Sequence, residues 1–333
     1  MIEISFCIPT YNKGKGGYLE AALDSILCQL DADIKDKVEI CISDDASTDN
    51  TKEIIENYQK KYPNIKSFYF EKNTGAGRNY CHSISLASGR YIWFMGGDDI
   101  VEKDGIRYIL SEIKKDEDIF FYLADPFLCF NNMTQKRKVV RKTLKKEIIL
   151  DSCKDIILNA ALDVGQISFI IFRKRDWDLV ENYERFYSFS APHFYHIWTV
   201  FKRGGRFKYL PKEVCSYRCE NSFFAKDDAY KRFYILTAET RQIAEAVFGK
   251  NSWEVKEIDK TILREHIFTA IVFFGKLTRP HPVIFSIKAA CLMIKLYGAN
   301  PFLYLYSYKI IPALLCPAFI LKFIKAVYRK IKK

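Results

Sequence analysis

The chain has 333 residues, of which 49% are hydrophobic, 28% charged and 15% aromatic. This composition is that of a globular protein with a sizeable core, and it excludes a disordered or fibrous chain. The net charge of +12 is unevenly distributed: residues 1–130 carry 15 basic and 22 acidic side chains, whereas residues 131–333 carry 37 and 18. This basic excess indicates a polyanionic partner, either nucleic acid or an anionic membrane.

The N-terminus and the cysteines indicate the compartment. Residues 1–8 contain Glu3, no basic region and only a short apolar run, so we expect no signal peptide. The ten cysteines are scattered through apolar stretches without a Cys-x-x-Cys pair, which favours buried free thiols in a reducing cytosol.

Strand-like and helix-like segments alternate through the first 125 residues. We expect strands at 2–9, 38–43, 67–70, 91–95 and 119–124, and helices at 18–30, 48–62, 79–87 and 104–114. This alternation predicts an α/β protein with a mostly parallel sheet flanked by helices.

Ligands of such sheets bind outside the carboxyl ends of the strands. Three predicted strands end in polar clusters, namely Thr10-Tyr11-Asn12, Asp44-Asp45 and Asp98-Asp99. We therefore expect these clusters to meet at one edge of the sheet.

The pair Asp98-Asp99 follows an apolar strand and two glycines. Adjacent carboxylates suit Mg²⁺ or Mn²⁺, which prefer oxygen ligands and usually bridge to substrate phosphates. The alternative is a solvated turn or a cap for the helix at 104. Asp44-Asp45 could likewise accept a hydrogen bond from a base or ribose, or cap the next helix.

Four segments taken together carry more information than any one of them. They are Ile8-Pro-Thr-Tyr-Asn12, Ile42-Ser-Asp-Asp-Ala-Ser-Thr-Asp-Asn-Thr51, Asn73-Thr-Gly-Ala-Gly-Arg-Asn79 and Gly89-Arg-Tyr-Ile-Trp-Phe-Met-Gly-Gly-Asp-Asp99. In order and spacing they resemble the signature of family 2 glycosyltransferases with the Rossmann-like GT-A fold, over about residues 2–125. The first segment and the aromatic strand before Asp98 are similar to the abequosyltransferase-like branch of O-antigen enzymes.

The resemblance implies a nucleotide-sugar donor bound at these strand ends. The implied binding residues are Pro9, Thr10, Tyr11, Asp44, Asp45, Arg78 and Asp98. Tyr11 would lie against the base, Asp45 would hydrogen-bond the base, and Arg78 would lie near the base and diphosphate.

The resemblance also implies a divalent metal, Mn²⁺ or Mg²⁺, coordinated by Asp99, with Asp98 contacting the ribose or the sugar. Many family members carry a further acid at the position of Gly96. Its absence predicts weak or dispensable metal binding, a ligand from elsewhere such as His193, or a catalytically inactive scaffold.

Enzymes of this kind invert the anomeric centre and use a general base for the acceptor hydroxyl. His193 resembles a histidine of the same branch and is the expected base, whereas a helix-start or core histidine is the alternative. Four acids remain alternative bases: Asp176, Asp178, Glu181 and Glu184. The resemblance also places the loop that begins at Arg218 on the acceptor side.

Residues 266–333 contain eleven Lys or Arg and no acid. Within them, Ala299–Leu321 has one charge and three prolines, which favours broken helices lying on an anionic membrane surface. A hairpin packed on the catalytic domain and a spanning helix remain open. Nucleic acid is not expected as a partner, because the basic excess accompanies long apolar runs and no nucleic-acid motif.

These observations predict three parts: a nucleotide-sugar-binding GT-A half (1–130), an acceptor-binding part of the catalytic domain (131–265) and a basic, membrane-associated helical tail (266–333). The expected reaction transfers a sugar to a saccharide on a polyprenyl diphosphate lipid, at the cytoplasmic face of a bacterial inner membrane, in surface-polysaccharide synthesis. A transferase that acts on a soluble or protein acceptor is the alternative.

Overall fold

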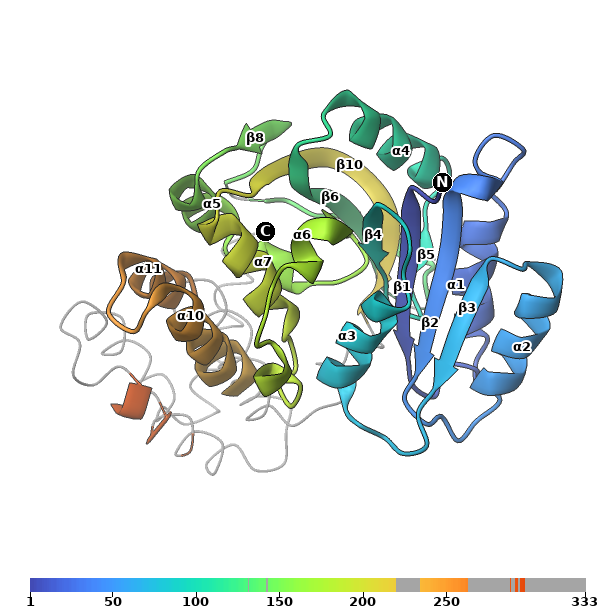
Figure 1. Ribbon diagram of the computed structural model, residues 1–333, viewed down its shortest axis with the longest axis horizontal. Helices are drawn as coiled ribbons and strands as arrows, with labels where there is room; N and C mark the ends of the chain where they lie inside the picture. The colour runs from blue at the N-terminus through green and yellow to red at the C-terminus, as the bar shows by residue number, and fades with distance from the viewer. Residues whose placement is uncertain are drawn as a thin grey trace, which may run out of the picture. The chain divides into compact units, whose positions relative to one another are not determined.

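The structure is a computed structural model. It describes residues 1–130, 132–141, 143–219, 234–262, 288, 291–292 and 294–296. The chain divides into two compact units, Met1–Ala225 and Lys226–Lys333. The first unit is built on one sheet with helices packed on both of its faces (Figure 1).

The strands of the first unit are β1 (Ile4–Thr10), β2 (Val38–Asp44), β3 (Ile65–Tyr69), β4 (Tyr91–Phe94), β5 (Ile100–Val101), β6 (Ile119–Phe130), β7 (Gln135–Lys138), β8 (Ile148–Leu150), β9 (Ile170–Arg173) and β10 (Arg206–Arg218). Its α-helices are α1 (Tyr18–Leu27), α2 (Thr51–Lys61), α3 (Ala76–Ser85), α4 (Gly105–Lys115), α5 (Cys153–Ala160), α6 (Lys174–Asp178) and α7 (His193–Lys202). Short 3₁₀ turns are η1 (Lys35–Lys37), η2 (Asp163–Gly165) and η3 (Glu184–Phe186).

In the described part of the chain these ten strands form one sheet. Eight of them follow the order β3-β2-β1-β4-β9-β6-β10-β5, while β7 pairs with β6 and β8 with β10. The first four strands are parallel, as are β6 and β10. Antiparallel pairs enter in the second half, where β9 runs against both β4 and β6. The predicted α/β fold class with flanking helices is confirmed. The sheet is mixed rather than mostly parallel, and its parallel pairing is concentrated where the alternation of strands and helices was clearest.

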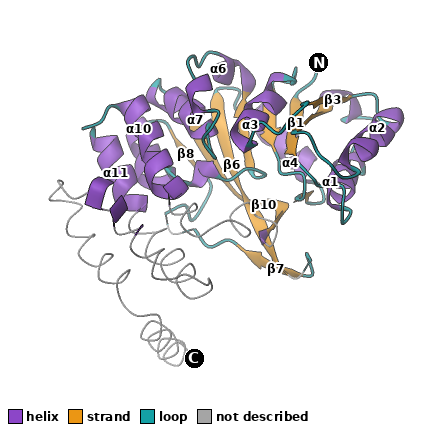
Figure 2. Cartoon of the chain, turned by 90° about the horizontal axis from the view of Figure 1, so that it is seen from below, coloured by secondary structure: helices purple, strands orange, loops and turns teal. Residues whose placement is uncertain are grey.

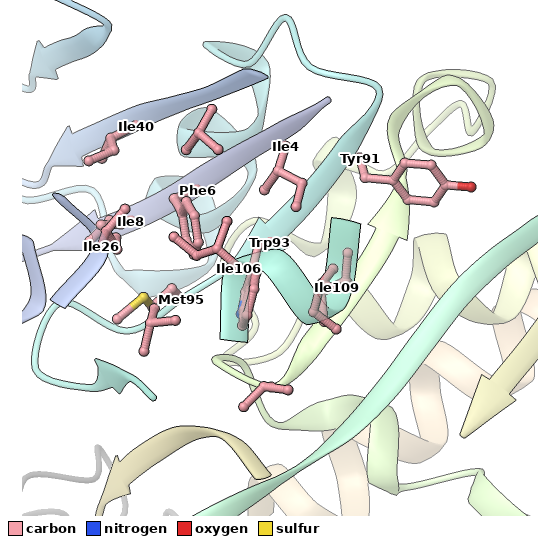
Figure 3. Packing of buried hydrophobic residues seen from close by; sticks show 14 of the residues in the cluster. Ile4, Phe6, Ile8, Ile26, Ile40, Tyr91, Trp93, Met95, Ile106 and Ile109 are labelled. Carbon is pink, nitrogen blue, oxygen red and sulfur yellow. The ribbon is translucent and has the colours of Figure 1, made fainter. Parts of the chain in front are cut away.

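Alternate residues of β1 face opposite layers of helices. Ile4, Phe6 and Ile8 belong to the main core, which is formed with apolar side chains of α1, α2 and α4 (Figure 3). The Phe6 ring stacks on Trp93 of β4 with 4.9 Å between ring centroids. On the other side of the sheet α3 packs against β1 and β2. Burial on both faces explains why β1 reads as an almost continuous apolar run.

Three segments differ from the expectations. The sequence predicts a short strand over 206–210, whereas β10 continues to Arg218, because a register shift between Leu210 and Glu213 accommodates Pro211 as a bulge. The sequence predicts a basic connector over 131–150, but this stretch contains β7 and β8. Strand β7 pairs antiparallel with the end of β6 (Figure 2), and β8 pairs antiparallel with β10. Helix α3 begins three residues before the predicted start.

The second unit is described over 234–262 and a few later residues. A π-helical turn, η5 (Ile235–Glu239), leads into α10 (Thr240–Phe248), and α11 (Trp253–Thr261) begins after the cap Ser252. Almost all of the predicted tail 266–333 lies outside the described residues. Among the residues that are described, no helix is long and apolar enough to cross a membrane.

His196 of α7 is a titratable group in the core of the first unit. It is fully buried, and its ring lies parallel to Trp177 of α6 with 3.7 Å between centroids. Burial lowers the pKa of His196 to about 3, with the neighbouring His193 adding to the shift. The neutral imidazole is therefore the form compatible with this packing.

This burial predicts acid lability. The pKa of His196 is about 3 in the folded protein and near its ordinary value in the unfolded chain. At pH values between the two, the unfolded chain binds a proton at His196 and the folded protein does not, so the free energy of unfolding falls as the pH decreases through this window. From about pH 7 to about pH 5 this group should cost about 2 kcal/mol. His196→Phe keeps an aromatic ring and should lose correspondingly less stability on acidification, measured by urea unfolding at the two pH values. Equal losses in both proteins would contradict the assignment.

Candidate active site

The carboxyl ends of β1, β2 and β4 lie side by side. Thr10 is opposite Asp44 in the β1–β2 register, and the Asp45 amide donates to the Thr10 carbonyl at 3.0 Å. The Asn79 amide of α3 donates to the same carbonyl at 3.1 Å. The parallel pairing of β1 with β4 and the ion pair between Lys13 and Asp98 bring the third polar cluster to the same edge of the sheet, as predicted.

Asp44 and Asp45 are both buried but have different partners. Asp45 accepts from the Thr74 amide (2.7 Å), the Thr74 hydroxyl (2.8 Å) and the Gly75 amide (3.0 Å), so its carboxylate holds the start of α3. Asp44 accepts from the amide and hydroxyl of Ser47, and burial raises the pKa of Asp44. Neither carboxylate caps α2, whose first amide donates instead to Asp49.

The remaining predicted donor-binding residues surround this edge. Pro9 and Thr10 are buried at the end of β1, whereas Tyr11 is 45% exposed. The buried Thr10 hydroxyl has no hydrogen-bond partner among the described residues. Arg78 is an exposed residue of α3, and its guanidinium lies 5.5 Å from the centre of the Phe70 ring.

The turn after β4 carries Asp98 and Asp99 in different environments. The Asp98 carboxylate pairs with Lys13 at 2.7 Å and keeps partial exposure. Asp99 is only 2% exposed; one of its oxygens accepts from the Ser168 hydroxyl and the other from the Arg218 amide at 2.8 Å. Burial and the negative charge of Asp98 raise the pKa of Asp99 to about 7.

Gly96 explains part of this geometry. A Cβ at this position would lie 2.9 Å from Oδ2 of Asp99 and 3.4 Å from the Ser168 hydroxyl. Any side chain here would therefore push against the carboxylate or the hydroxyl that holds it. The absence of a side chain at position 96 thus leaves room for the Asp99 carboxylate and the Ser168 hydroxyl to lie close to the backbone of the turn.

The donor set of the turn is compatible with a divalent cation. The described residues contain no cluster of three or more His, Cys, Asp or Glu that could by itself hold a metal ion. However, Mg²⁺ and Mn²⁺ commonly use one or two carboxylates and take their other ligands from phosphates and water. Asp98 and Asp99 supply such a pair, and each Asp99 oxygen accepts one protein hydrogen bond while a carboxylate oxygen can accept two.

His193, the predicted base, begins α7 and is 1% exposed. Its ring packs near Phe94 of β4 and Tyr80 of α3, with centroids 5.7 and 6.1 Å away. Its Nε2 lies 3.1 Å from the Gly165 carbonyl, and burial lowers the pKa of His193 to about 4. The ring is therefore neutral at physiological pH and donates from Nε2.

The alternative acids have other partners or positions. Asp176 and Asp178 form ion pairs with Arg173 and Lys174 within one helical turn. Glu181 and Glu184 are exposed.

Three residues at the carboxylate pair were not anticipated there: Lys13, Ser168 and Arg218. Lys13 follows the first polar cluster directly, and this closeness in sequence was a usable signal. Ser168 and Arg218 come from 69 and 119 residues beyond Asp99, and nothing in their local sequence indicates the contact.

Comparisons with known proteins identify the family of the chain. Residues 5–174 match the model of glycosyl transferase family 2. The chain is 31% identical over 274 residues to the abequosyltransferase RfbV of Salmonella typhimurium, covering 79% of this chain and 80% of the relative.

Solved structures share the fold. S. aureus TarS 1–349 in complex with UDP-GlcNAc superposes with a TM-score of 0.67 at 19% identity, over 94% of this chain and 90% of that one. The mannosyltransferase PcManGT of Pyrobaculum calidifontis, in complex with GDP-Man and Mn²⁺, gives 0.53 at 15% identity, over 98% and 88%.

The GT-A fold, the order of the strand-end motifs and these similarities lead to one conclusion. The chain belongs to glycosyl transferase family 2 and is a glycosyltransferase.

Proposed function

We propose that this enzyme transfers a sugar from a nucleoside-diphosphate donor to a hydroxyl of a saccharide, with inversion at the anomeric carbon. The observation that carries the proposal is the meeting of Thr10, Asp45 and the Asp98-Asp99 turn at one edge of the sheet. The similarity to an abequosyltransferase over most of the chain supports a hexosyl or deoxyhexosyl donor and a role in O-antigen or related surface-polysaccharide synthesis.

The donor would lie across the ends of β1, β2 and β4. Exposed Tyr11 offers a face for the base, and the buried Thr10 hydroxyl, which has no partner among the described residues, offers a hydrogen bond. Asp45 and Asp44 present acceptors for base or ribose N–H and O–H groups, and the exposed Arg78 guanidinium presents a positive charge for the diphosphate. Pro9 lies one residue before the end of β1, directly next to Thr10 in this cluster.

Asp98 and Asp99 would hold a divalent cation, Mn²⁺ or Mg²⁺, against the diphosphate. When bound, such an ion offsets the negative charge that develops on the leaving nucleoside diphosphate. The protein's own contribution is to keep the two carboxylates fixed: Asp98 by Lys13, and Asp99 by Ser168 and the Arg218 amide.

A donor panel with matched aspartate variants tests the reaction. UDP-, CDP-, GDP- and dTDP-sugars, each with and without Mn²⁺, are assayed for transfer and hydrolysis. Asp99→Asn keeps the size of the side chain and should lower kcat about 10³-fold, because it removes the charge that holds the cation. Asp98→Asn should have a smaller effect.

Asp104→Asn is the control for this panel, since Asp104 is exposed and makes no side-chain cap hydrogen bond to α4. It should behave as wild type. Full activity of Asp99→Asn would contradict the proposal. If the wild type neither hydrolyses nor transfers any of the donor sugars, an inactive scaffold would be favoured.

We further propose His193 as the general base for the acceptor hydroxyl. Because Nε2 faces the Gly165 carbonyl, Nδ1 carries the lone pair, and it has no hydrogen-bond partner among the described residues. The ring is buried, so the acceptor must displace neighbouring side chains to reach it.

His193→Gln should lower kcat about 10²-fold or more, with the KM for the donor changed little, because only the proton transfer is lost. Steady-state kinetics with varied donor and acceptor separate the two effects. If Glu184→Gln is the inactive variant and His193→Gln remains near normal, the base is Glu184 instead.

The acceptor that we propose is a saccharide linked to polyprenyl diphosphate, presented at the cytoplasmic face of the inner membrane. The support is the sequence of 266–333, with eleven basic and no acidic residues among aromatic and aliphatic ones. This pattern suits peripheral binding to an anionic surface. A soluble or protein acceptor is the alternative.

Removal of residues 301–333 tests the membrane role. This segment holds seven Lys or Arg, each worth about 1 kcal/mol near an anionic leaflet, so truncation should release the enzyme from vesicles that contain acidic lipid. Activity on a lipid-linked acceptor should fall while donor hydrolysis persists, because the donor-site residues all lie before residue 100.

Co-sedimentation with vesicles, with and without added salt, is the measurement, and neutral vesicles are the control. The full chain should bind less at high salt. Equal sedimentation of the full and truncated proteins would refute the membrane role.

A further inference from the structure

Ser168 occupies an unusual backbone position between η2 and β9. Its φ is +87°, a region that favours glycine, and the side chain is fully buried. The residue is tied to β4 by its main chain: its amide donates to the Phe94 carbonyl at 2.7 Å, and its carbonyl accepts from the Trp93 indole at 2.9 Å. Strained conformations of this kind are retained where the surrounding structure requires them, often at functional sites.

The Ser168 hydroxyl joins two parts of the carboxylate turn. It accepts from the Gly96 amide at 2.9 Å and donates to Oδ2 of Asp99. A hydroxyl has only one proton. Because the Ser168 oxygen accepts from the Gly96 amide, this proton is donated to the Asp99 carboxylate. The hydroxyl therefore fixes both the backbone of the turn and the side chain that follows it.

The other oxygen of Asp99 is held from a different strand. Oδ1 accepts from the backbone amide of Arg218, at the end of β10, at 2.8 Å. The Arg218 side chain also donates to the Asp98 carbonyl at 3.2 Å and lies 4.7 Å from the Tyr18 ring centre. With one donor on each oxygen, the Asp99 carboxylate cannot rotate without breaking a buried hydrogen bond.

We propose that Ser168 is a positioning residue for the reaction, which orients the Asp99 carboxylate toward the cation and diphosphate of the donor. This proposal rests on the metal-assisted function given above. It explains why a serine is kept in a backbone conformation suited to glycine: glycine would satisfy the backbone but would supply no hydroxyl. Hydrogen-bond partners of metal ligands typically change metal affinity 10- to 100-fold when they are removed.

Two substitutions separate the hydroxyl from the backbone. Ser168→Gly removes the hydroxyl and suits the positive φ, so the fold should be kept. Ser168→Ala removes the hydroxyl but retains the strain, so its Tm should be lower than that of Ser168→Gly. Both should raise the Mn²⁺ concentration for half-maximal transfer about tenfold or more, and kcat should recover toward wild type as Mn²⁺ is increased.

Calorimetric titration with Mn²⁺ alone gives a readout that is independent of turnover, and it should show the same loss of affinity in both variants. Ser5→Ala is the matched control, because the Ser5 hydroxyl is also buried and donates to a buried carboxylate, Glu39, at 2.6 Å, near the start of β1. It should lower Tm without changing the Mn²⁺ dependence.

Two results would overturn the role of Ser168. In the first, Ser168→Gly needs a Mn²⁺ concentration for half-maximal transfer within about twofold of that of wild type, although removing a hydrogen-bond partner of a metal ligand should raise it about tenfold or more. The other is wild-type transfer that is unaffected by EDTA, which would remove the cation that Ser168 is proposed to serve. In the second case the observed transfer would still uphold the proposed glycosyl transfer, so the two proposals fail separately.

Discussion

The parallel pairing of β1 with β2 on one side and β4 on the other is the constraint on which the proposed active site depends. Parallel strands end at the same edge, so the register that places Thr10 opposite Asp44 also brings the end of β4 beside them. The Met95 amide extends this pairing to the Cys7 carbonyl at 3.0 Å, immediately before the two glycines of the carboxylate turn. Thr10 and Asp99, which are 89 positions apart in the chain (99 − 10), thereby come to the same edge of the sheet.

Burying carboxylates at this edge requires hydrogen-bond donors, and the fold supplies them mostly from backbone amides and hydroxyls. Asp45 is held by Thr74 and Gly75, and Asp99 by Ser168 and the Arg218 amide. These neutral donors orient the carboxylates without cancelling their charge. Asp98 differs, because the Lys13 ammonium faces it directly. The edge is therefore organised before a ligand arrives, which is the condition for electrostatic catalysis.

The second half of the sheet completes the site from outside the parallel region. Antiparallel β9 places Ser168 beside β4, and the long β10 delivers Arg218 to the same turn. The bulge near Pro211 lets β10 run far enough to do so. The family match covers 5–174 and so includes Ser168 but stops before Arg218. The carboxylate turn is thus supported both by a strand inside the matched region and by one beyond it.

Local sequence determined the early strands and helices, the α/β class and the strand-end clusters, because hydrophobic periodicity and polar strand ends are properties of neighbouring residues. The ordered motifs also carried the resemblance to the family, which the comparisons confirm, whereas the donor-binding residues that it implies stay a prediction. The partners of Asp99 could not be predicted this way, since Ser168 and Arg218 reach it only through the pairing of β9 and β10. The burial of His193, which lowers its pKa, likewise comes from packing against β4 and α3. The tertiary structure alone decided these contacts, because they join elements whose local patterns carry no information about each other.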